Sequence, residues 1–450
     1  MVDTSDLRIR NATTFNGSIS IKANTGALNV ESVSAGGAGS TATLTAQSGA
    51  IVDSNGATLN VSAANVALVA AAGVASLADA LETATTNLES SGGTVGTFVA
   101  NTGDLTIGGV TAGLTGISGA GNVSVQTVGS LTLSENVTAS ANAATIALSA
   151  TANVNLPIGT LVRAGTIGNF GTVTVSIDTD GSGGGQLDFD GDVDAANATF
   201  SGNSSSDTFN VKPDQDATSA ERTPISIQGA APTTAPGDVL NLNITSLTSP
   251  SLTVQGVNQG SWSFGNAQTV TYSSIETVNT SPSGTPYNLI LDMEPTLSAL
   301  DPNADIIDVR RNGTSLEIRV DGTPVFVGAE ADIMSLQVLG GNTQDDALVI
   351  TETASGLPSF FGASATPGSH VSSTFTSLTG YNNVTAPVKI HFDGRGGSNS
   401  IQLALSTTHG AVYTSDSLDT NKSGNVGIGA DSSFAIRQLG LSFERIAALG

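Results

Sequence analysis

The stretch Gly121-Asn-Val-Ser-Val-Gln-Thr-Val-Gly-Ser-Leu-Thr-Leu-Ser-Glu-Asn-Val137 is one pattern written twice. In each copy a glycine is followed by apolar residues at alternate positions, Val123 and Val125 in the first copy and Leu131 and Leu133 in the second. An alternation with a period of two is typical of a β-strand with one buried face. The stretch therefore predicts two short strands whose valine and leucine side chains face the same interior.

The same pattern recurs at Gly26–Val33 and at Gly103–Val110. One short strand cannot bury its apolar face alone, but stacked copies can, which is the principle of a solenoid. Gly121 and Gly129 mark the corners, where φ is often positive and glycine turns without strain. Separate strands of a sandwich are the alternative. The solenoid is favoured because the two copies abut without a hairpin turn between them.

These patterns predict an all-β fold, a parallel β-helix or β-solenoid. Over residues 1–200 we expect the solenoid with one short inserted helix near 72–91, because Val74, Leu77, Leu81 and Leu88 have helical spacing. For residues 201–450 we expect either a continuation of the solenoid or a second β-rich module. Proline becomes more frequent there, and glycine and Asn/Asp turns precede the strands.

Composition limits the possible partners. Of 450 residues, 38 are acidic and 14 are Lys or Arg, which gives a net charge of −24. This charge argues against nucleic acid and anionic lipid as partners. No apolar run is long enough to cross a membrane. The first residues lack the basic and apolar regions of a signal peptide, so we expect a segment of a longer protein or a mature chain.

A second pattern follows residue 200, a glycine and Asn/Asp turn followed by a strand. It occurs at Gly202–Val211, Pro236–Ile244, Gly340–Ile350 and Gly396–Leu405. Pattern copies such as Asn101–Gly108 and Ser206–Pro213 resemble the repeat regions of very large bacterial secreted and surface proteins, of the haemagglutinin-like adhesin and degenerate calcium-repeat types.

This resemblance covers most of residues 20–280 and, more weakly, 305–450. It implies export to the bacterial cell surface or the extracellular space, a stacked β architecture, and adhesive or structural work. The intact glycine-and-aspartate calcium nonapeptide is absent, since Ser204-Ser-Ser206 stands in its place.

One acidic cluster is a candidate metal site. Leu187-Asp-Phe-Asp-Gly-Asp-Val-Asp194 alternates strictly, so in one strand its aspartates would form a column about 6.6 Å apart on one face. A hard cation such as Ca²⁺ would relieve their repulsion, whereas a solvated strand face is the alternative reading. With two aspartates just upstream, the predicted metal ligands are Asp178, Asp180, Asp188, Asp190, Asp192 and Asp194.

No histidine or serine lies in a catalytic spacing, so we expect a protein that is not an enzyme. The predicted function is a structural or adhesive rod segment of a large bacterial surface or filament protein. Its expected partners are copies of itself joined end to end, flanking modules of the same protein, or surface glycans. Two alternatives remain, a self-assembling surface-layer subunit and a polysaccharide-cleaving β-helix enzyme.

Overall fold

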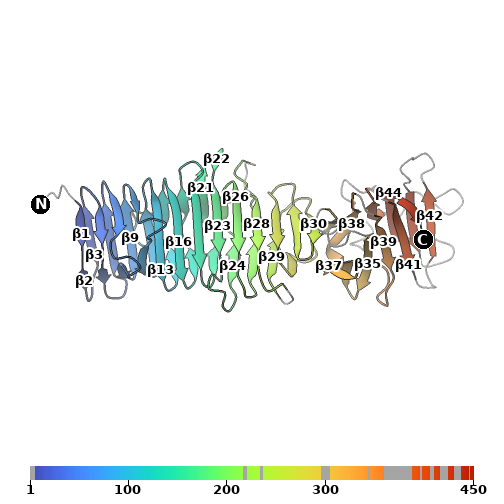
Figure 1. Ribbon diagram of the computed structural model, residues 1–450, viewed down its shortest axis with the longest axis horizontal. Coiled ribbons are helices and arrows are strands. Elements are labelled where there is room, and N and C mark those ends of the chain that lie inside the picture. The colour runs from blue at the N-terminus through green and yellow to red at the C-terminus, as the bar shows by residue number, and fades with distance from the viewer. Residues whose placement is uncertain are drawn as a thin grey trace. The chain divides into compact units, whose positions relative to one another are not determined.

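The computed structural model is all-β, as the sequence predicts (Figure 1). Within the described residues the one helical element is a 3-10 turn, Glu330–Asp332, so no helix there could cross a membrane. Contacts divide the chain into two units, residues 1–243 with 274–277 and residues 244–273 with 278–450. The structure describes residues 6–215, 220–233, 237–294, 305–342, 345–358, 388–395, 398–405, 410–415, 424–429, 437–444 and 446–449.

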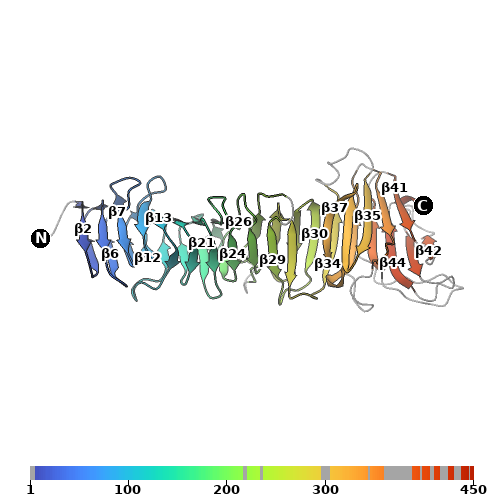
Figure 2. The ribbon, with the colours of Figure 1, turned by 90° about the horizontal axis from the view of Figure 1, so that it is seen from below.

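The first four turns of the first unit contribute one strand each to three parallel columns, seen from two sides in Figures 1 and 2. The first column is β1 (Leu7–Ile9), β4 (Leu28–Val30), β7 (Ala50–Asp53) and β10 (Gly73–Val74). The second is β2 (Ala12–Thr14), β5 (Val33–Ala35), β8 (Val61–Ala63) and β11 (Leu81–Ala84). The third is β3 (Ile19–Ala23), β6 (Thr41–Ala46), β9 (Asn65–Ala70) and β12 (Asn87–Ser91).

The cross-section of the stack changes at the fifth turn. There β10 and β11 both pair with one long strand, β13 (Gly96–Thr102), while β12 pairs with two short ones, β14 (Leu105–Ile107) and β15 (Ile117–Gly119). The column from β13 continues through β16 (Asn122–Val128), β19 (Thr145–Ala150), β23 (Thr172–Ser176), β26 (Asn197–Ser201) and β28 (Ile225–Gln228).

The two short strands begin columns of their own. From β14 these are β17 (Leu131–Leu133), β20 (Val154–Leu156), β24 (Gln186–Phe189), β27 (Thr208–Val211) and β29 (Val239–Asn243). From β15 they are β18 (Val137–Ala139), β21 (Leu161–Thr166) and β25 (Asp192–Asp194), and β22 (Asn169–Phe170) forms a hairpin with β21. The stacking passes residue 200 without a break, because β26 pairs with β28 and β27 with β29.

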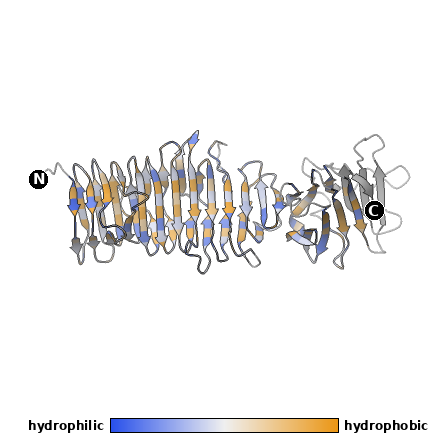
Figure 3. Ribbon diagram, in the orientation of Figure 1, coloured by the Kyte–Doolittle hydropathy of each residue, from blue (hydrophilic) through white to orange (hydrophobic). Residues whose placement is uncertain are grey.

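The alternating residues of the opening stretch face the interior as predicted. Val123 and Val125 are buried, and Leu131 stacks between Leu105 and Val154 with no exposed surface. Figure 3 shows the same alternation along other strands of the first unit, as orange and blue segments that follow one another. Small and β-branched side chains suit this interior, because each layer must fit directly onto the next.

The corner glycines serve two different purposes. Gly129 has a φ of +142°, as a corner glycine is expected to have. Gly121 has no positive φ, but a Cβ there would lie 2.1 Å from the carbonyl carbon and oxygen of Val95. Gly121 is therefore needed for the close approach of two neighbouring turns rather than for its backbone conformation.

The predicted helix at 72–91 is wrong. The segment forms β10, a turn closed by hydrogen bonds between Ser76 and Asp79, then β11 and β12. The sequence misleads here because two inward positions hold polar residues, which hides the period of two. Thr83 and Ser90 are buried beside Leu81 and Leu88, and their hydroxyls bond to Asn101 Oδ1 and Thr97 Oγ1 at 2.9 Å.

The second unit mixes parallel stacking with hairpins. One sheet stacks β30 (Ser251–Gly256), β34 (Tyr287–Asp292), β38 (Ile333–Leu339), β40 (Val388–Asp393) and β44 (Arg437–Glu444) in parallel. Its antiparallel strands are β31 (Gln259–Ser263), β32 (Val270–Ser273), β42 (Gly410–Ser415) and β43 (Gly424–Gly429). Strand β33 (Thr277–Ser281) follows β32 along the chain.

The other sheet of the second unit has a parallel part and an antiparallel part. The strands β35 (Ile306–Asn312), β39 (Ala347–Thr351), β41 (Asn399–Ala404) and β45 (Ile446–Leu449) are parallel. The strands β36 (Ser315–Val320) and β37 (Thr323–Ala329) extend it from β35 in antiparallel fashion. The fully buried Trp262 packs its ring edge-on against Tyr287, with 4.9 Å between centroids.

Candidate functional site

The acidic segment 187–194 is two strands rather than one. Strand β24 pairs with β20, and β25 pairs with β21. Between them the chain turns at Asp190 and Gly191, whose N–H groups both donate to the carbonyl of Leu156, at 3.0 and 2.8 Å. The inward residues are correctly predicted, since Leu187, Phe189 and Val193 are buried. The expected single column of four aspartates does not form, because the turn directs the two strands to different columns.

Asp188 lies at the end of a row of amide side chains on successive turns. Asn241 Nδ2 donates to Asn210 Oδ1 at 2.7 Å, and Asn210 Nδ2 donates to Asp188 Oδ1 at 2.6 Å. Gln186 Nε2 reaches both oxygens of Asp188, each at 2.8 Å. The Asp188 carboxylate therefore accepts its hydrogen bonds from the side-chain amides of Gln186 and Asn210.

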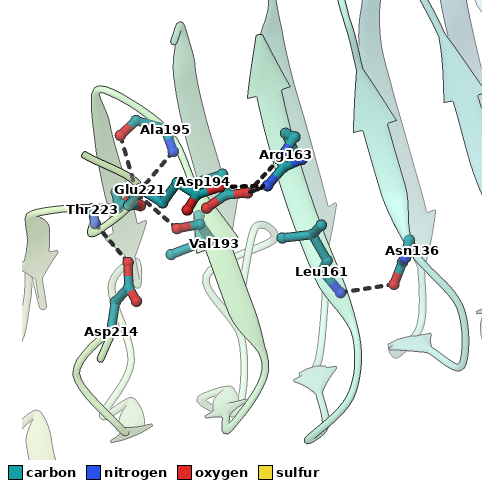
Figure 4. Close-up of polar contacts among 9 residues, drawn as sticks. All are labelled: Asn136, Leu161, Arg163, Val193, Asp194, Ala195, Asp214, Glu221 and Thr223. Carbon is teal, nitrogen blue, oxygen red and sulfur yellow. Dashed lines mark hydrogen bonds and ion pairs between the residues drawn. The ribbon is translucent and has the colours of Figure 1, made fainter. Parts of the chain in front are cut away.

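Asp194 is buried and paired with a cation (Figure 4). Arg163, on the neighbouring strand β21, forms an ion pair with its carboxylate and also contacts Glu221 at 3.2 Å. Burial raises the pKa of Asp192, and the charge of Asp194 raises it further, while Arg163 acts in the opposite direction. The sequence places Arg163 and Asp194 31 residues apart, and only the register of β21 with β25 brings them together.

Thr223 is held beside this ion pair by hydrogen bonds to β25 and to Asp214. The hydroxyl of Thr223 donates to Val193 O at 2.7 Å and accepts from Ala195 N at 2.8 Å, and Thr223 N donates to Asp214 Oδ2 at 2.6 Å (Figure 4). These bonds hold Thr223, two residues after Glu221, against β25 and connect Asp214 to it. The cluster is a clamp between turns, in which the partly exposed Arg163 pairs with the buried Asp194 and with the partly exposed Glu221.

The remaining predicted ligands lie apart from these strands. Asp180 is exposed on a turn, where its Oδ1 accepts from Ser182 N at 3.1 Å. Asp178 is fully buried with a φ of +49°, and neither of its carboxylate oxygens has a hydrogen-bond partner within the described residues. In the part of the chain that the structure describes, no three Asp, Glu or His side chains are grouped so that they could hold one metal ion.

A second acidic cluster, which sequence reasoning did not propose as a site, lies beside Asp178. We call Asp207, Asp238 and Glu276 the acidic ladder, because each precedes a strand of one column and each carboxylate bonds to the turn before. The signal for it is in the second repeat pattern, whose acidic residue stands directly before the strand. That pattern places Asp207 and Asp238 in register, which makes the burial of both predictable.

The same pattern operates in the second unit, at Asp346 and Asn399. Asp346 N donates to Asn399 Oδ1 at 2.8 Å, and the carboxylate oxygen Oδ2 of Asp346 accepts from Gly341 N at 2.6 Å. Burial raises the pKa of Asp346. Gly396 and Gly397, which begin the fourth copy of the pattern, lie outside the described residues.

Comparison with known proteins adds no relative. No family model matches the chain, and neither the curated proteins nor the solved structures include a match.

Proposed function

We propose that the chain is a non-enzymatic structural or adhesive segment of a large extracellular bacterial surface or filament protein. The observation that carries the proposal is the unbroken parallel pairing of successive turns in the first unit, from β1 to β29, which persists through the change of cross-section at the fifth turn. A stack of this kind has no natural length, so it suits a spacer that is extended by adding turns.

The first turn offers an edge for another chain. Leu7 N donates to Ala27 O and Glu31 N donates to Ile9 O, so both ends of β1 bond toward β4. The backbone groups of Arg8 between them point the other way. Thr13 has the same place in β2, since Ala12 N donates to Ser32 O and Gly36 N to Thr14 O. Within the described residues no strand covers this side of β1 and β2, and such an edge invites pairing with a further turn or a second copy.

The arrangement of the acidic side chains supports a non-enzymatic role over polysaccharide cleavage. A glycosidase needs a pair of carboxyl groups that reach the substrate from the surface. Here Asp194 is buried and paired with Arg163, and the side-chain amides of Gln186 and Asn210 donate hydrogen bonds to the carboxylate of Asp188. These contacts account for the two acids structurally without a substrate.

Electron microscopy of the purified chain tests the proposal together with an assay for cleavage. Rods or end-to-end fibres, with no products from polyuronides or neutral glycans, are the expected result. A planar lattice would favour the surface-layer alternative. Cleavage that is lost in a Glu221→Gln variant would contradict the proposal, because that change removes the acid of the cluster with the larger exposed surface.

A further inference from the structure

The acidic ladder connects successive turns of the first unit through its carboxylates. Gly185 N donates to Asp207 Oδ1 at 2.6 Å, Asp207 N to Asp238 Oδ1 at 2.7 Å, and Asp238 N to Glu276 Oε2 at 2.6 Å. Each acid thus reaches back one turn and accepts from the backbone of the residue stacked beneath it. The ladder fixes the start of β24, β27 and β29 against one another.

Asp238 differs from Asp207 in its second oxygen. Asp207 Oδ2 accepts from Asn203 N at 2.8 Å, so both oxygens of that carboxylate are satisfied. Asp238 is equally buried, but its Oδ2 has no hydrogen-bond partner within the described residues. A buried carboxylate oxygen without a donor is costly, and far more so when the group is charged.

The neighbour of this oxygen is another acceptor. A Cβ at Gly229 would lie 2.0 Å from Ser274 O and 2.3 Å from Asp238 Oδ2. The carbonyl oxygen of Ser274 and Oδ2 of Asp238 therefore both border the small space that this glycine leaves open. Two acceptors in such a position repel each other unless one of them carries a hydrogen that it can donate.

The charged groups around Asp238 are all acids. Burial is the largest cause that raises the pKa of Asp238, to about 7, and Asp207, Glu276 and Asp178 raise it further. Within the described residues no Lys, Arg or His opposes them. The hydrogen bond from Asp207 N to Asp238 Oδ1 acts in the opposite direction, but burial and the three acids outweigh it, so the balance favours the neutral form of Asp238.

A single metal ion does not fit this arrangement. Asp178 lies in the turn of Gly185, since a Cβ at Gly185 would be 3.0 Å from Asp178 N. Asp238 lies two turns further on, which places the two levels about 9.6 Å apart at the usual strand spacing. Within the described residues no three Asp, Glu or His side chains are grouped so that they could hold one metal ion.

We propose that Asp238 holds a proton on Oδ2, donates it to the carbonyl of Ser274, and so makes the stacking of β27 and β29 sensitive to pH. This hydrogen bond would connect Asp238, the residue before β29, to the segment 274–277 of the same unit. Loss of the proton leaves two acceptors with no hydrogen between them and a buried charge near three further acids. The last turns of the first unit then open more readily than its first turns.

The direction of the pH effect follows from linkage. The pKa of Asp238 is about 7 in the folded chain and close to 3.9 in an unfolded one. The stabilisation is therefore fully present below about pH 3.9, declines as the pH rises, and is lost once the pH passes about 7. Between pH 5 and pH 8 the equilibrium constant for opening should rise about 100-fold.

Hydrogen exchange of the whole chain, read peptide by peptide, measures this change. Each rate is divided by the intrinsic rate at its pH, and Val239–Asn243 is compared with Thr41–Ala46 of the same unit. In the wild type, protection of Val239–Asn243 should fall about 100-fold from pH 5 to pH 8 relative to Thr41–Ala46. Asp238→Asn should abolish this relative fall, whereas Asp190→Asn, the same change at an exposed turn, should retain it.

Two results would overturn the proposal: relative protection in the wild type that is independent of pH, or an equal fall in Asp238→Asn. Glu276→Gln provides a second variant if Asp238→Asn does not fold. It keeps an acceptor for Asp238 N and removes one negative charge, which lowers the pKa of Asp238 in the folded chain. The fall in protection should therefore be smaller and should level off at lower pH, which moves its midpoint down. An unchanged midpoint in Glu276→Gln would also contradict the proposal.

Discussion

Leu131 shows how strongly the interior constrains a single side chain. It is fully buried and stacks between Leu105 and Val154 on the neighbouring turns. Leu131→Asp would bury a carboxylate without a partner, and we expect it to lower the free energy of unfolding by several kcal/mol. Urea denaturation followed by circular dichroism measures this. Thr132→Asp, one residue along, is the matched control and should unfold nearly as the wild type does.

Gly121 tests the close approach between turns. Gly121→Ala would place a Cβ 2.1 Å from the Val95 carbonyl, so the two turns must separate. Gly109→Ala is the control, since that glycine has a φ of +74° and open space around its Cβ position. We expect the control to cost about 1–2 kcal/mol for its backbone conformation, and Gly121→Ala to cost more. Equal melting temperatures for the two variants would contradict this reading of the corner.

Inward residues were predictable from the sequence wherever the alternation is apolar. Val123, Leu131, Leu187 and Phe189 all face the interior, because a strand with one buried face must repeat every two residues. The polar environment of the acidic residues was not predictable in the same way. Whether Asp194 meets solvent or Arg163 depends on the register of strands 31 residues apart, which no local pattern encodes.

At the scale of elements, the sequence identified most strands but misplaced a helix and a turn. The helix was predicted because Leu77 completes a helical spacing, yet its side chain is 73% exposed on a turn. The single strand at 187–194 was predicted because the alternation of residue types continues across Gly191, where the chain turns. In both places the chain turns at a corner between two strands, yet the spacing of apolar residues continues across that corner.

The pairing of β21 with β25 makes a prediction about Arg163. Arg163→Ala removes the arginine that pairs with the buried Asp194. Because Arg163 is 36% exposed, we expect a loss of about 1–3 kcal/mol, between the values for exposed and for fully buried pairs. Arg8→Ala is the matched control, because the Arg8–Glu31 pair joins neighbouring turns in the same way but its arginine is 57% exposed. Exposed pairs contribute about 0–1 kcal/mol. If urea denaturation gives Arg163→Ala a free energy of unfolding no lower than that of Arg8→Ala, the proposed stabilisation by the Arg163–Asp194 pair is contradicted.

At the scale of the whole molecule, composition and repetition together indicated the architecture, since few aromatic residues and many short periodic strands suit stacked turns. They could not indicate that the second unit adds antiparallel strands to its parallel stack, because hairpins and corners use the same glycine-rich turns. The acidic surface, with a net charge of −24, should weaken association between copies at low salt and permit it at physiological salt.

The central claim, that the chain is a stackable segment whose first turn accepts another chain, is tested most directly by sedimentation velocity. The wild type is compared at rising concentration and physiological salt with Thr13→Pro, which removes an outward N–H while leaving the bonds from β2 to β5 in place. Thr13→Val is the control, since it keeps the N–H and a β-branched side chain. We expect the wild type and Thr13→Val to form larger species and Thr13→Pro to remain monomeric. Monomers for all three, or equal association of all three, would contradict the account.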